Sequence, residues 1–441
     1  VVGLNTATTS RIVKGLLNDC AASAVVVQHQ YAHYIKEIVD ECPSLLLKVM
    51  SGSYEEDGDQ GNISSADFQE IQLEGSPEPP RLDIAAKDLA TIIYTSGTTG
   101  NPKGVMLSHR NLEANTDSIV EYLHLTAHDK VMSVLPFYYS YGHSLLLTHI
   151  RVGGAVVIDN RFAYPNVVLD VMSREKVTGF SGVPSTFAIL MHRSNFAKYN
   201  WDHLRYITQA GGPMTPALTS KLMETLPNTK IYVMYGQTEA SARLSYLDPD
   251  NLVKKLGSIG KAIPGVTLTV RDENGQVCPP NTEGEIVASG DNIMLGYWNQ
   301  PVETARILKA DGLHTGDLAR CDDDGYLFIV GRNSEMIKSG AHRISPKEIE
   351  VILGEHEAVL ESAVIGVPDE IMGESIKAVV VLKDGFSTSE KDIIKHCTMN
   401  LPPFKVPKIV EFVETLPKTT SGKIQKHLLK NAEIKTSGAQ G

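Results

Sequence analysis

Residues 94–104 are the part of the chain whose residue types point most clearly to chemistry. They read Tyr-Thr-Ser-Gly-Thr-Thr-Gly-Asn-Pro-Lys-Gly and follow an apolar run, 89–94, that is typical of a buried strand. Hydroxyls and backbone N–H groups in such a loop suit phosphate oxygens, and the lysine adds a positive charge. Glycines, Gly104 among them, permit positive φ angles and a close approach to a ligand. The candidate phosphate-binding residues are Thr95, Ser96, Gly97, Thr98, Thr99, Gly100 and Lys103.

This loop differs from the Walker phosphate loop, because Lys103 is not followed by Ser or Thr. A flexible Gly/Ser/Thr loop without a ligand is the alternative interpretation, and the length of the pattern after a strand disfavours it. We therefore expect a phosphate-bearing ligand here.

Four further segments carry groups of related chemistry. After the strand-like run 231–234, Thr238 offers a hydroxyl to a phosphate and Glu239 offers a hard oxygen to Mg²⁺. In 314–318, Asp317 could accept both hydroxyls of a ribose, although a capped turn is the alternative. The segment 331–340 lies where the composition changes, and 416–424 places Lys423 in a second Ser/Thr/Gly loop, which alone would be a solvated tail.

The composition narrows the class of protein. The 441 residues are enough for two or more domains, and a net charge of −11 argues against a general nucleic-acid surface. The five cysteines are scattered and form no Cys-x-x-Cys pair, which favours a reducing compartment without disulfides or zinc. With no signal peptide and no membrane-spanning run, a cytoplasmic protein is expected. The start at Val1 without methionine suggests a truncated beginning.

Strand and helix patterns alternate along most of the chain, which predicts parallel sheets covered on both faces. The strand candidates are 24–27, 89–94, 130–135, 155–159, 206–210 and 231–235. The helix candidates are 10–19, 111–123 and 216–226, the last with Thr215 as N-cap and Pro216 in its first turn. Residues 51–82 are rich in Ser, Gly, Asp, Glu and Pro, and we expect a long loop there.

The last third of the chain changes character twice. Residues 257–290 predict a smaller β-rich subdomain, and 333–430 predict β-α-β-β-α-β-like units of an independent domain. Its element candidates are 348–353, 362–366, 376–382, 390–401 and 409–412. The expected fold class is α/β, with a large N-terminal domain, 1–331, of stacked α/β subdomains plus the β-rich subdomain. A small α+β C-terminal domain, 332–441, would follow.

The five motifs, in this order and at these separations, resemble the adenylate-forming superfamily. This superfamily contains acyl-CoA synthetases, aryl-CoA ligases, firefly luciferase and nonribosomal-peptide adenylation domains. The resemblance runs from about Asp88 to Lys426. It implies an AMP-forming ligase with a mobile C-terminal domain, using ATP, Mg²⁺ and either CoA or the phosphopantetheine of a carrier protein.

The resemblance also implies roles for individual residues. The 95–104 loop, with Lys103, holds the β- and γ-phosphates of ATP. At the adenine, the expected contacts are Gly211, Gly212 and Pro213 along the base, Tyr235 stacked on it, and the adjoining Gly236 and Gln237. Thr238 contacts the α-phosphate and Glu239 binds Mg²⁺. Asp317 and Arg332 contact the ribose. Lys423 bridges the carboxylate and the α-phosphate during adenylation. Ser334, where relatives carry Asp or Lys, is the hinge, and the loop with Lys338 and Gly340 then lines a pantetheine tunnel.

The residues expected to line the acyl pocket are a mixture of aromatic and small ones, without a charged anchor. Its candidate residues are Tyr138, Tyr139, Tyr141, His143, Gly182, Val183, Pro184, Ser185, Gln209 and Gly236. Tyr138 stands where amino-acid-activating relatives place an Asp, which favours a fatty or aryl acid. Tyr139 matches an aromatic gate of the tunnel, although these tyrosines could be only a pocket wall. His143 is interpreted as a structural histidine.

Three functions follow from these considerations. The first is activation of a carboxylic acid by ATP, with release of pyrophosphate, and transfer to CoA. The second is a stand-alone adenylation enzyme that loads an acyl or amino acid onto a carrier protein, since both acceptors present the same thiol arm. The third, disfavoured by the presence of Lys423, Glu239 and Asp317, is a non-catalytic nucleotide-binding scaffold. The particular acid and the oligomeric state are left open.

Overall fold

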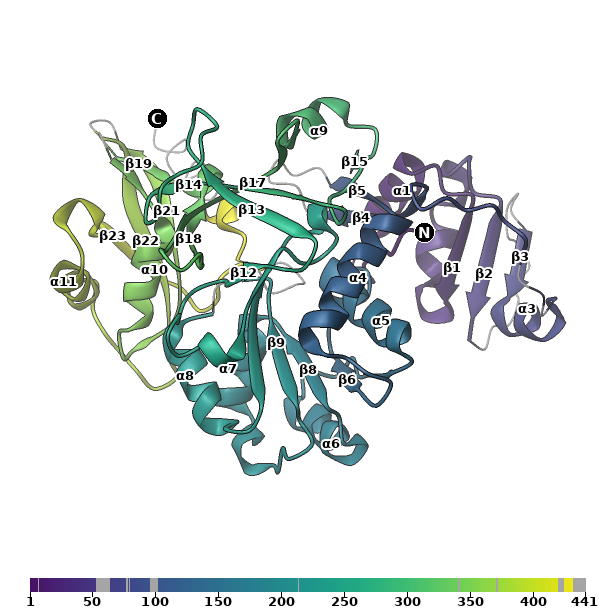
Figure 1. Cartoon of the computed structure of the whole chain (residues 1–441), viewed down its shortest axis with the longest axis horizontal. Coiled ribbons are helices and arrows are strands. Elements are labelled where there is room, and N and C mark those ends of the chain that lie inside the picture. Colours follow the sequence, from purple (N-terminus) through teal and green to yellow (C-terminus); the bar gives the residue numbers. More distant parts are fainter. Residues whose placement is uncertain are drawn as a thin grey trace. The chain divides into compact units, whose positions relative to one another are not determined.

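The computed structural model (Figure 1) describes residues 1–6, 8–52, 64–76, 78, 80–95, 102–212, 214–339, 342–369, 372–418 and 424–430. Contacts between Cα atoms divide the chain into two compact units, Val1–Asp88 and Leu89–Gly441. Each unit has sheets and a core of its own, so each is described by itself.

The first unit is a small parallel α/β sheet. Its strands are β1 (Ala24–Gln28), β2 (Leu47–Ser51) and β3 (Ser64–Asp67), and its helices are α1 (Ser10–Asp19), α2 (Ala32–Lys36) and α3 (Phe68–Glu74). Val13, Leu17 and Val25 are buried between them. The predicted helix 10–19 and strand 24–27 are confirmed.

The long loop expected at 51–82 is partly wrong, because β3 and α3 lie within it. The strand pairs in parallel with β2, and Asp67 caps the helix by accepting hydrogen bonds from the backbone N–H groups of Gln69 and Glu70. Neither element has a buried residue, so the sequence has no hydrophobic periodicity there that would predict them.

The second unit is built on a seven-stranded sheet in the order β12-β11-β10-β9-β8-β6-β7. The parallel strands are β6 (Lys130–Ser133), β7 (Ala155–Ile158), β8 (Gly179–Gly182), β9 (Tyr206–Gln209) and β10 (Lys230–Tyr235). Two antiparallel strands, β11 (Ser245–Leu247) and β12 (Lys261–Ala262), extend one edge. The strands predicted from 130, 155, 206 and 231 onward are all confirmed.

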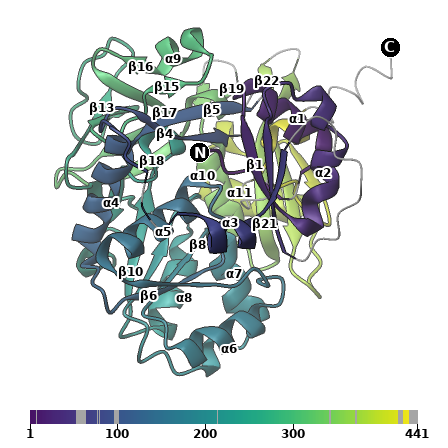
Figure 2. The same ribbon diagram turned by 90° about the vertical axis from the view of Figure 1, so that its right-hand side faces the viewer.

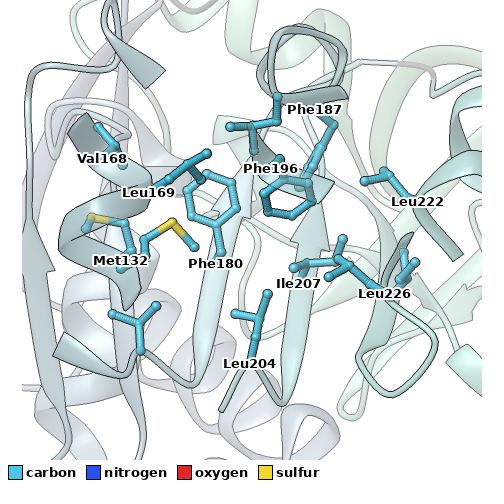
Figure 3. Close-up of a cluster of buried hydrophobic side chains, with 14 of the residues drawn as sticks. Met132, Val168, Leu169, Phe180, Phe187, Phe196, Leu204, Ile207, Leu222 and Leu226 are labelled. Atoms are coloured by element: carbon cyan, nitrogen blue, oxygen red, sulfur yellow. The ribbon is translucent and has the colours of Figure 1, made fainter. Parts of the chain in front are cut away.

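Helices cover both faces of this sheet, as the alternation of strands and helices predicts. They are α4 (His109–Leu123), α5 (Ser140–Val152), α6 (Pro165–Glu175), α7 (Pro184–Arg193) and α8 (Pro216–Thr225). In β9, Ile207 packs with residues of α6, α7 and α8, whereas Tyr206 packs with residues of α4 and α5. Figure 3 shows the first of these cores, in which Phe180 and Phe187 meet edge to face with ring centroids 5.9 Å apart.

Two antiparallel strands, β4 and β5, flank the loop of the first motif. β4 (Leu89–Thr95) pairs with β5 (Lys103–Ser108), which pairs with β15 (Gly296–Tyr297), and α9 (Pro301–Ile307) follows β15. The β-rich region continues beyond the predicted end at residue 290. Its strands are β13 (Val266–Arg271), β14 (Glu283–Gly290), β16 (Leu308–Lys309), β17 (Gly312–Cys321) and β18 (Leu327–Arg332).

The C-terminal elements form a further sheet with its own core. The strands are β19 (Ile337–Ser339), β20 (His342–Ile344), β21 (Val359–Asp369), β22 (Gly373–Leu382) and β23 (Ile409–Phe412), with helices α10 (Pro346–Gly354) and α11 (Glu390–Asn400). Figure 2 shows both helices beside the strands. Ile349, Leu353, Val364 and Ile393 are fully buried between them. Across the described residues, the chain forms no helix that is both long and apolar enough to cross a membrane.

Candidate active site

The carboxyl ends of the parallel strands bring the predicted acyl and adenine segments together. A Cβ built on Gly211, whose φ is +86°, would lie 3.2 Å from Cγ1 of Val183, so the loop after β9 lies against the turn after β8. Ser140 Oγ, at the start of α5, lies 3.2 Å from Thr238 Oγ1, which follows β10. The segments that follow β6, β8, β9 and β10 thus lie at the carboxyl ends of the strands, where ligands bind in open parallel sheets.

Gly236 is required by a close approach of two backbone segments. A Cβ at this position would lie 2.1 Å from the carbonyl oxygen of Ala242. The chain then turns through a 3-10 helix, Thr238–Ala240, and Ser241 has a φ of +63°. The tight turn presents Gln237, Thr238 and Glu239 in succession past the strand end.

Tyr235, Asp317 and Arg332 form one hydrogen-bonded cluster. The Tyr235 hydroxyl donates to Asp317 Oδ2 at 2.7 Å, and Arg332 Nε donates to Asp317 Oδ1 at 2.9 Å. Asp317 and Arg332 are also direct partners in the pairing of β17 with β18. Burial, followed by the negative charge of Asp317, raises the pKa of Tyr235 well above its ordinary value, so its hydroxyl remains a donor. The three predicted adenine and ribose contacts therefore lie together.

The segment before Asp317 is held by two carboxylates, those of Glu285 and Asp311. Glu285 Oε1 accepts a hydrogen bond from the Gly316 N–H at 2.9 Å, and its Oε2 lies 2.8 Å from Nδ1 of His314. The other ring nitrogen of His314 lies 3.1 Å from Asp311 Oδ1. Both contacts hold the turn that delivers Asp317.

Glu239 and Lys103 meet at Tyr297. The Tyr297 hydroxyl donates to Glu239 Oε1 at 2.7 Å, and Lys103 Nζ lies 5.0 Å from the centre of the same ring. Lys103 also forms an ion pair with Glu303 of α9 at 2.7 Å. A pocket of about 320 Å³ opens beside them, lined in part by Gln237, Glu239, Tyr297, Thr315, Gly316 and Asn333.

The positive φ expected for Gly104 is wrong. Gly104 lies within β5 and is not among the described glycines that have a positive φ. A Cβ there would lie 2.9 Å from Ile92 Cγ2 and 3.1 Å from Tyr94 Cε1. The glycine is needed for close packing between β4 and β5.

Glu239 offers Mg²⁺ a carboxylate just after the end of β10. No group of three or more His, Cys, Asp or Glu suited to a metal occurs among the described residues. This fits Mg²⁺ when phosphates supply most of its ligands, because that ion commonly binds through one or two carboxylates and the substrate. Glu239, next to the candidate phosphate-binding Thr238, is in a suitable place.

The acyl-pocket candidates differ in their surroundings. Tyr138 and Tyr139 are half-buried with ring centroids 4.5 Å apart. Tyr141 is buried, its hydroxyl 2.8 Å from Thr208 Oγ1 and its ring 4.0 Å from the Arg243 guanidinium. Burial lowers the pKa of His143, so this imidazole is neutral near pH 7.

Two further acyl-pocket candidates, Gly182 and Gln209, lie at the ends of β8 and β9. Gln209 is almost fully buried, and its Nε2 donates to the Gly212 carbonyl at 2.7 Å. A Cβ at Gly182 would lie 2.8 Å from Thr186 Cγ2, at the start of α7, where Pro184 and Ser185 are half-buried. The glycine at 182 therefore lets the end of β8 lie close to α7.

The C-terminal elements are joined to β18 by polar contacts. The predicted hinge residue, Ser334, lies in the turn η6 (Asn333–Glu335) directly after β18. Ser345 Oγ donates to the Val330 carbonyl, and Lys347 Nζ donates to the Ile329 carbonyl at 3.0 Å. Lys338 lies in β19, and its backbone N–H donates to Glu374 at 2.6 Å.

Some predicted residues lie outside the described part of the chain. They are Ser96, Gly97, Thr98, Thr99, Gly100, Pro213, Gly340 and Lys423. Conversely, sequence reasoning missed Ser140, Tyr297 and Glu303. A Gly-Tyr-Trp run at 296–298 was visible, but its spacing to Lys103 and Glu239 gave no sign that they meet.

Comparisons with known proteins agree with the motifs. The family described as AMP-binding enzyme matches residues 1–298, and the AMP-binding enzyme C-terminal domain matches residues 348–423. A long-chain-fatty-acid–CoA ligase from Yersinia pestis is 33% identical over 99% of this chain and 81% of its own length. A second ligase of this name, from Bacillus subtilis, is 34% identical over 80% of this chain, which spans 63% of that relative. A feruloyl-CoA synthase from an Amycolatopsis species is 36% identical over 79% of this chain and 71% of its own.

Solved structures give the same result. ATP-bound MatB from Rhodopseudomonas palustris superposes with a TM-score of 0.86 and 31% identity, covering 98% of this chain and 83% of that chain. The anthranilate CoA ligase AuaEII, in complex with anthranoyl-AMP, has a TM-score of 0.85 and 29% identity over 98% of this chain and 82% of its own. The chain therefore belongs to the AMP-binding enzyme family, within the adenylate-forming superfamily that its motifs predict.

Proposed function

We propose that this protein is an AMP-forming ligase that joins a fatty or aryl carboxylic acid to CoA. The observation that carries the proposal is the meeting of Tyr235, Asp317 and Arg332 beside the turn with Thr238 and Glu239. These groups suit a nucleoside and its phosphates, and the chain's relatives are acyl-CoA ligases. The substrates are then ATP, the acid and CoA.

In the first half-reaction, a carboxylate oxygen of the acid attacks the α-phosphorus of ATP. The bond from that phosphorus to the bridging oxygen of the β-phosphate breaks, and pyrophosphate leaves with the bond's electrons. Two anions must approach each other, so the site has to supply cations and donors where charge builds up. Lys103 and Lys423 supply ammonium groups, and Thr238 supplies a hydroxyl to the α-phosphate. Mg²⁺, held by Glu239 with the phosphates, would neutralise charge on the triphosphate.

In the second half-reaction, the thiolate sulfur of CoA attacks the acyl carbon, and AMP leaves as the carbonyl re-forms. The C-terminal elements turn about Ser334, so that Lys423 leaves and the segment with Lys338 and Gly340 enters beside the thiol arm. Tyr139 stands at the inner end of that tunnel. The proposed boundary of the two domains falls between residues 331 and 332, one residue before β18 ends at Arg332 and η6 begins at Asn333.

The acid is inferred from the walls of the acyl pocket. Tyr138, Tyr139, Val183, Gly182 and the neutral His143 present apolar or uncharged surfaces, and Tyr138 stands where an amino acid would need a carboxylate partner. This supports an uncharged tail. The acids in the names of two relatives, long-chain fatty acids and ferulate, have such tails.

A carrier protein is the alternative acceptor, because its phosphopantetheine presents the same thiol.

The five cysteines, all among the described residues, are free thiols, which supports a reducing compartment such as the cytoplasm.

The test is ATP–pyrophosphate exchange with a panel of fatty, aryl and amino acids, each then offered CoA or a phosphopantetheinylated carrier protein. We expect exchange with one class of fatty or aryl acid and release of free acyl-CoA. Lys423→Ala should lower exchange about 100-fold or more, the effect of losing one preorganised charge donor. Lys395→Ala, at an exposed position of α11, is the matched control. A wild-type protein that never releases pyrophosphate rejects the proposal.

A further inference from the structure

The strand β15 ties the segment that carries Lys103 to the turn that carries Glu239. Tyr297 pairs with Val105 of β5, and the Trp298 N–H donates to the Gly104 carbonyl at 2.7 Å. Met294, just before β15, donates its N–H to the Glu239 carbonyl at 2.9 Å. In Figure 1, β4, β5, β15 and α9 lie together. The backbone on each side of Tyr297 is therefore held to one of the two segments.

The side chain of Tyr297 repeats this connection with charged groups. Only 6% of the residue is exposed, and its hydroxyl meets Glu239 Oε1 at 2.7 Å. A carboxylate only accepts hydrogen bonds, so the phenol is the donor. The Lys103 ammonium lies 5.0 Å from the centre of the ring, within the range of a cation–π contact.

Helix α9 contacts both Tyr297 and Lys103. Thr304 Oγ1 accepts a hydrogen bond from the Tyr297 N–H at 2.9 Å, and Glu303 binds Lys103 at 2.7 Å. Lys103 thus has its own carboxylate partner, and Glu239 has a neutral donor. Both charged groups contact the same side chain, the carboxylate at its hydroxyl and the ammonium at its ring.

We propose that Tyr297 is a positioning residue of the adenylation step: its hydroxyl orients the Glu239 carboxylate toward Mg²⁺, and its ring, together with Glu303, positions the Lys103 ammonium for phosphate. This inference rests on the proposed function. The hydroxyl acts on the carboxylate, and the ring acts on the ammonium. The two parts of one side chain should therefore affect two different measurements.

The experiment measures ATP binding by calorimetry, without acid, over a range of Mg²⁺ concentrations. Tyr297→Phe keeps the ring and removes the donor, so the Mg²⁺ concentration needed for half-maximal ATP affinity should rise about tenfold, the effect of losing a hydrogen bond to a charged group. ATP affinity at saturating Mg²⁺ should stay near the wild-type value. Tyr297→Leu also removes the ring and should weaken ATP binding even at saturating Mg²⁺.

The matched control is Tyr199→Phe. Tyr199 also donates to a carboxylate, Asp170 at 2.6 Å, but on an exposed part of the molecule. Its removal should leave the Mg²⁺ dependence unchanged. Melting temperatures of all variants separate loss of folding from loss of positioning.

Glu239→Asp tests the same contact from the carboxylate side, so the inference does not depend on Tyr297→Phe alone. Glu239→Asp shortens the carboxylate by one methylene and should cause the same shift in Mg²⁺ dependence, and Glu239→Asp with Tyr297→Phe should add little to either change. A Tyr297→Phe protein with wild-type Mg²⁺ dependence, or additive effects in the double variant, overturns the inference. If the wild-type protein does not bind ATP with Mg²⁺, the proposed function itself fails.

Discussion

The hydroxyl of Tyr235 donates a hydrogen bond to the carboxylate of Asp317 across 2.7 Å. Tyr235 ends the last parallel strand of the seven-stranded sheet, and Asp317 lies in the antiparallel sheet of the β-rich region. One hydrogen bond therefore links two sheets at the place where we expect adenine and ribose to bind. Because Asp317 is 5% exposed, each of its donors matters to the free energy of folding.

Tyr235→Phe should raise the KM for ATP several-fold while keeping the ring that we expect to stack on adenine. The variant removes a hydrogen bond to a buried carboxylate, which should also lower the free energy of unfolding by about 1–3 kcal/mol. ATP–pyrophosphate exchange and urea unfolding measure the two effects. Tyr164→Phe, at a largely exposed tyrosine, is the control. An unchanged KM for ATP would show that the Tyr235 hydroxyl does not position Asp317 for the nucleotide.

Gly236→Ala should abolish ATP–pyrophosphate exchange and destabilise the protein. The added Cβ would lie 2.1 Å from the backbone oxygen of Ala242, and no side-chain rotation relieves a contact with backbone. Gly15→Ala is the opposite case, because nothing lies within 4 Å of its Cβ and it is in the interior of α1. That change should stabilise α1 by about 1 kcal/mol. Circular dichroism melting and exchange assays compare them, and a stable, active Gly236→Ala protein would contradict the clash.

Local patterns predicted the elements whose signals are local. The strand at 206–210 has buried apolar side chains on both faces, and the helix beginning at Pro216 has Thr215 at its N-cap, accepting from Leu218 N–H. The order of the motifs then indicated the family. The strand Ser64–Asp67 was missed because its stability comes from pairing with β2, which no short window of sequence contains.

Long-range contacts of single side chains could not be predicted. The ion pair of Lys103 with Glu303 joins residues 200 positions apart, and the Tyr297–Glu239 hydrogen bond spans 58. Neither residue type nor spacing specifies these partners, because the register of β15 on β5 decides them. The pairing of β5 with β4 likewise made Gly104 a packing residue of a strand, where the composition of the loop had suggested a turn.

Lys347 should make stability depend on pH in a defined window. Burial lowers the pKa of its ammonium to about 8, although Glu350 and Asp317 oppose this shift. From pH 8 up to the ordinary value of 10.5, the unfolded chain binds this proton and the folded chain does not. Stability therefore rises with pH there, by at most about 1.4 kcal/mol per pH unit, and the contribution is constant below pH 8.

Lys347→Met removes this titration. The difference in free energy of unfolding between the wild-type protein and this variant should grow in favour of the wild type from pH 8 to pH 10, as urea unfolding at both values would measure. Parallel pH profiles of the two proteins would show that Lys347 is protonated in the folded state.

Lys426→Met should impair adenylation more than thioester formation. Lys426 Nζ lies 2.7 Å from Glu350 of α10 and 3.3 Å from Glu335 in η6, so it attaches the segment after Lys423 to both. Without it, the partly buried Glu350 loses its cation and Lys423 loses a nearby anchor. We expect exchange to fall about tenfold, since misplacement of a reacting group is costly, whereas CoA acylation from preformed acyl-adenylate should change little. Lys430→Met, which breaks only a 3.7 Å contact with Glu374, is the control. Equal loss in both half-reactions would mean that Lys426 stabilises the fold without positioning Lys423.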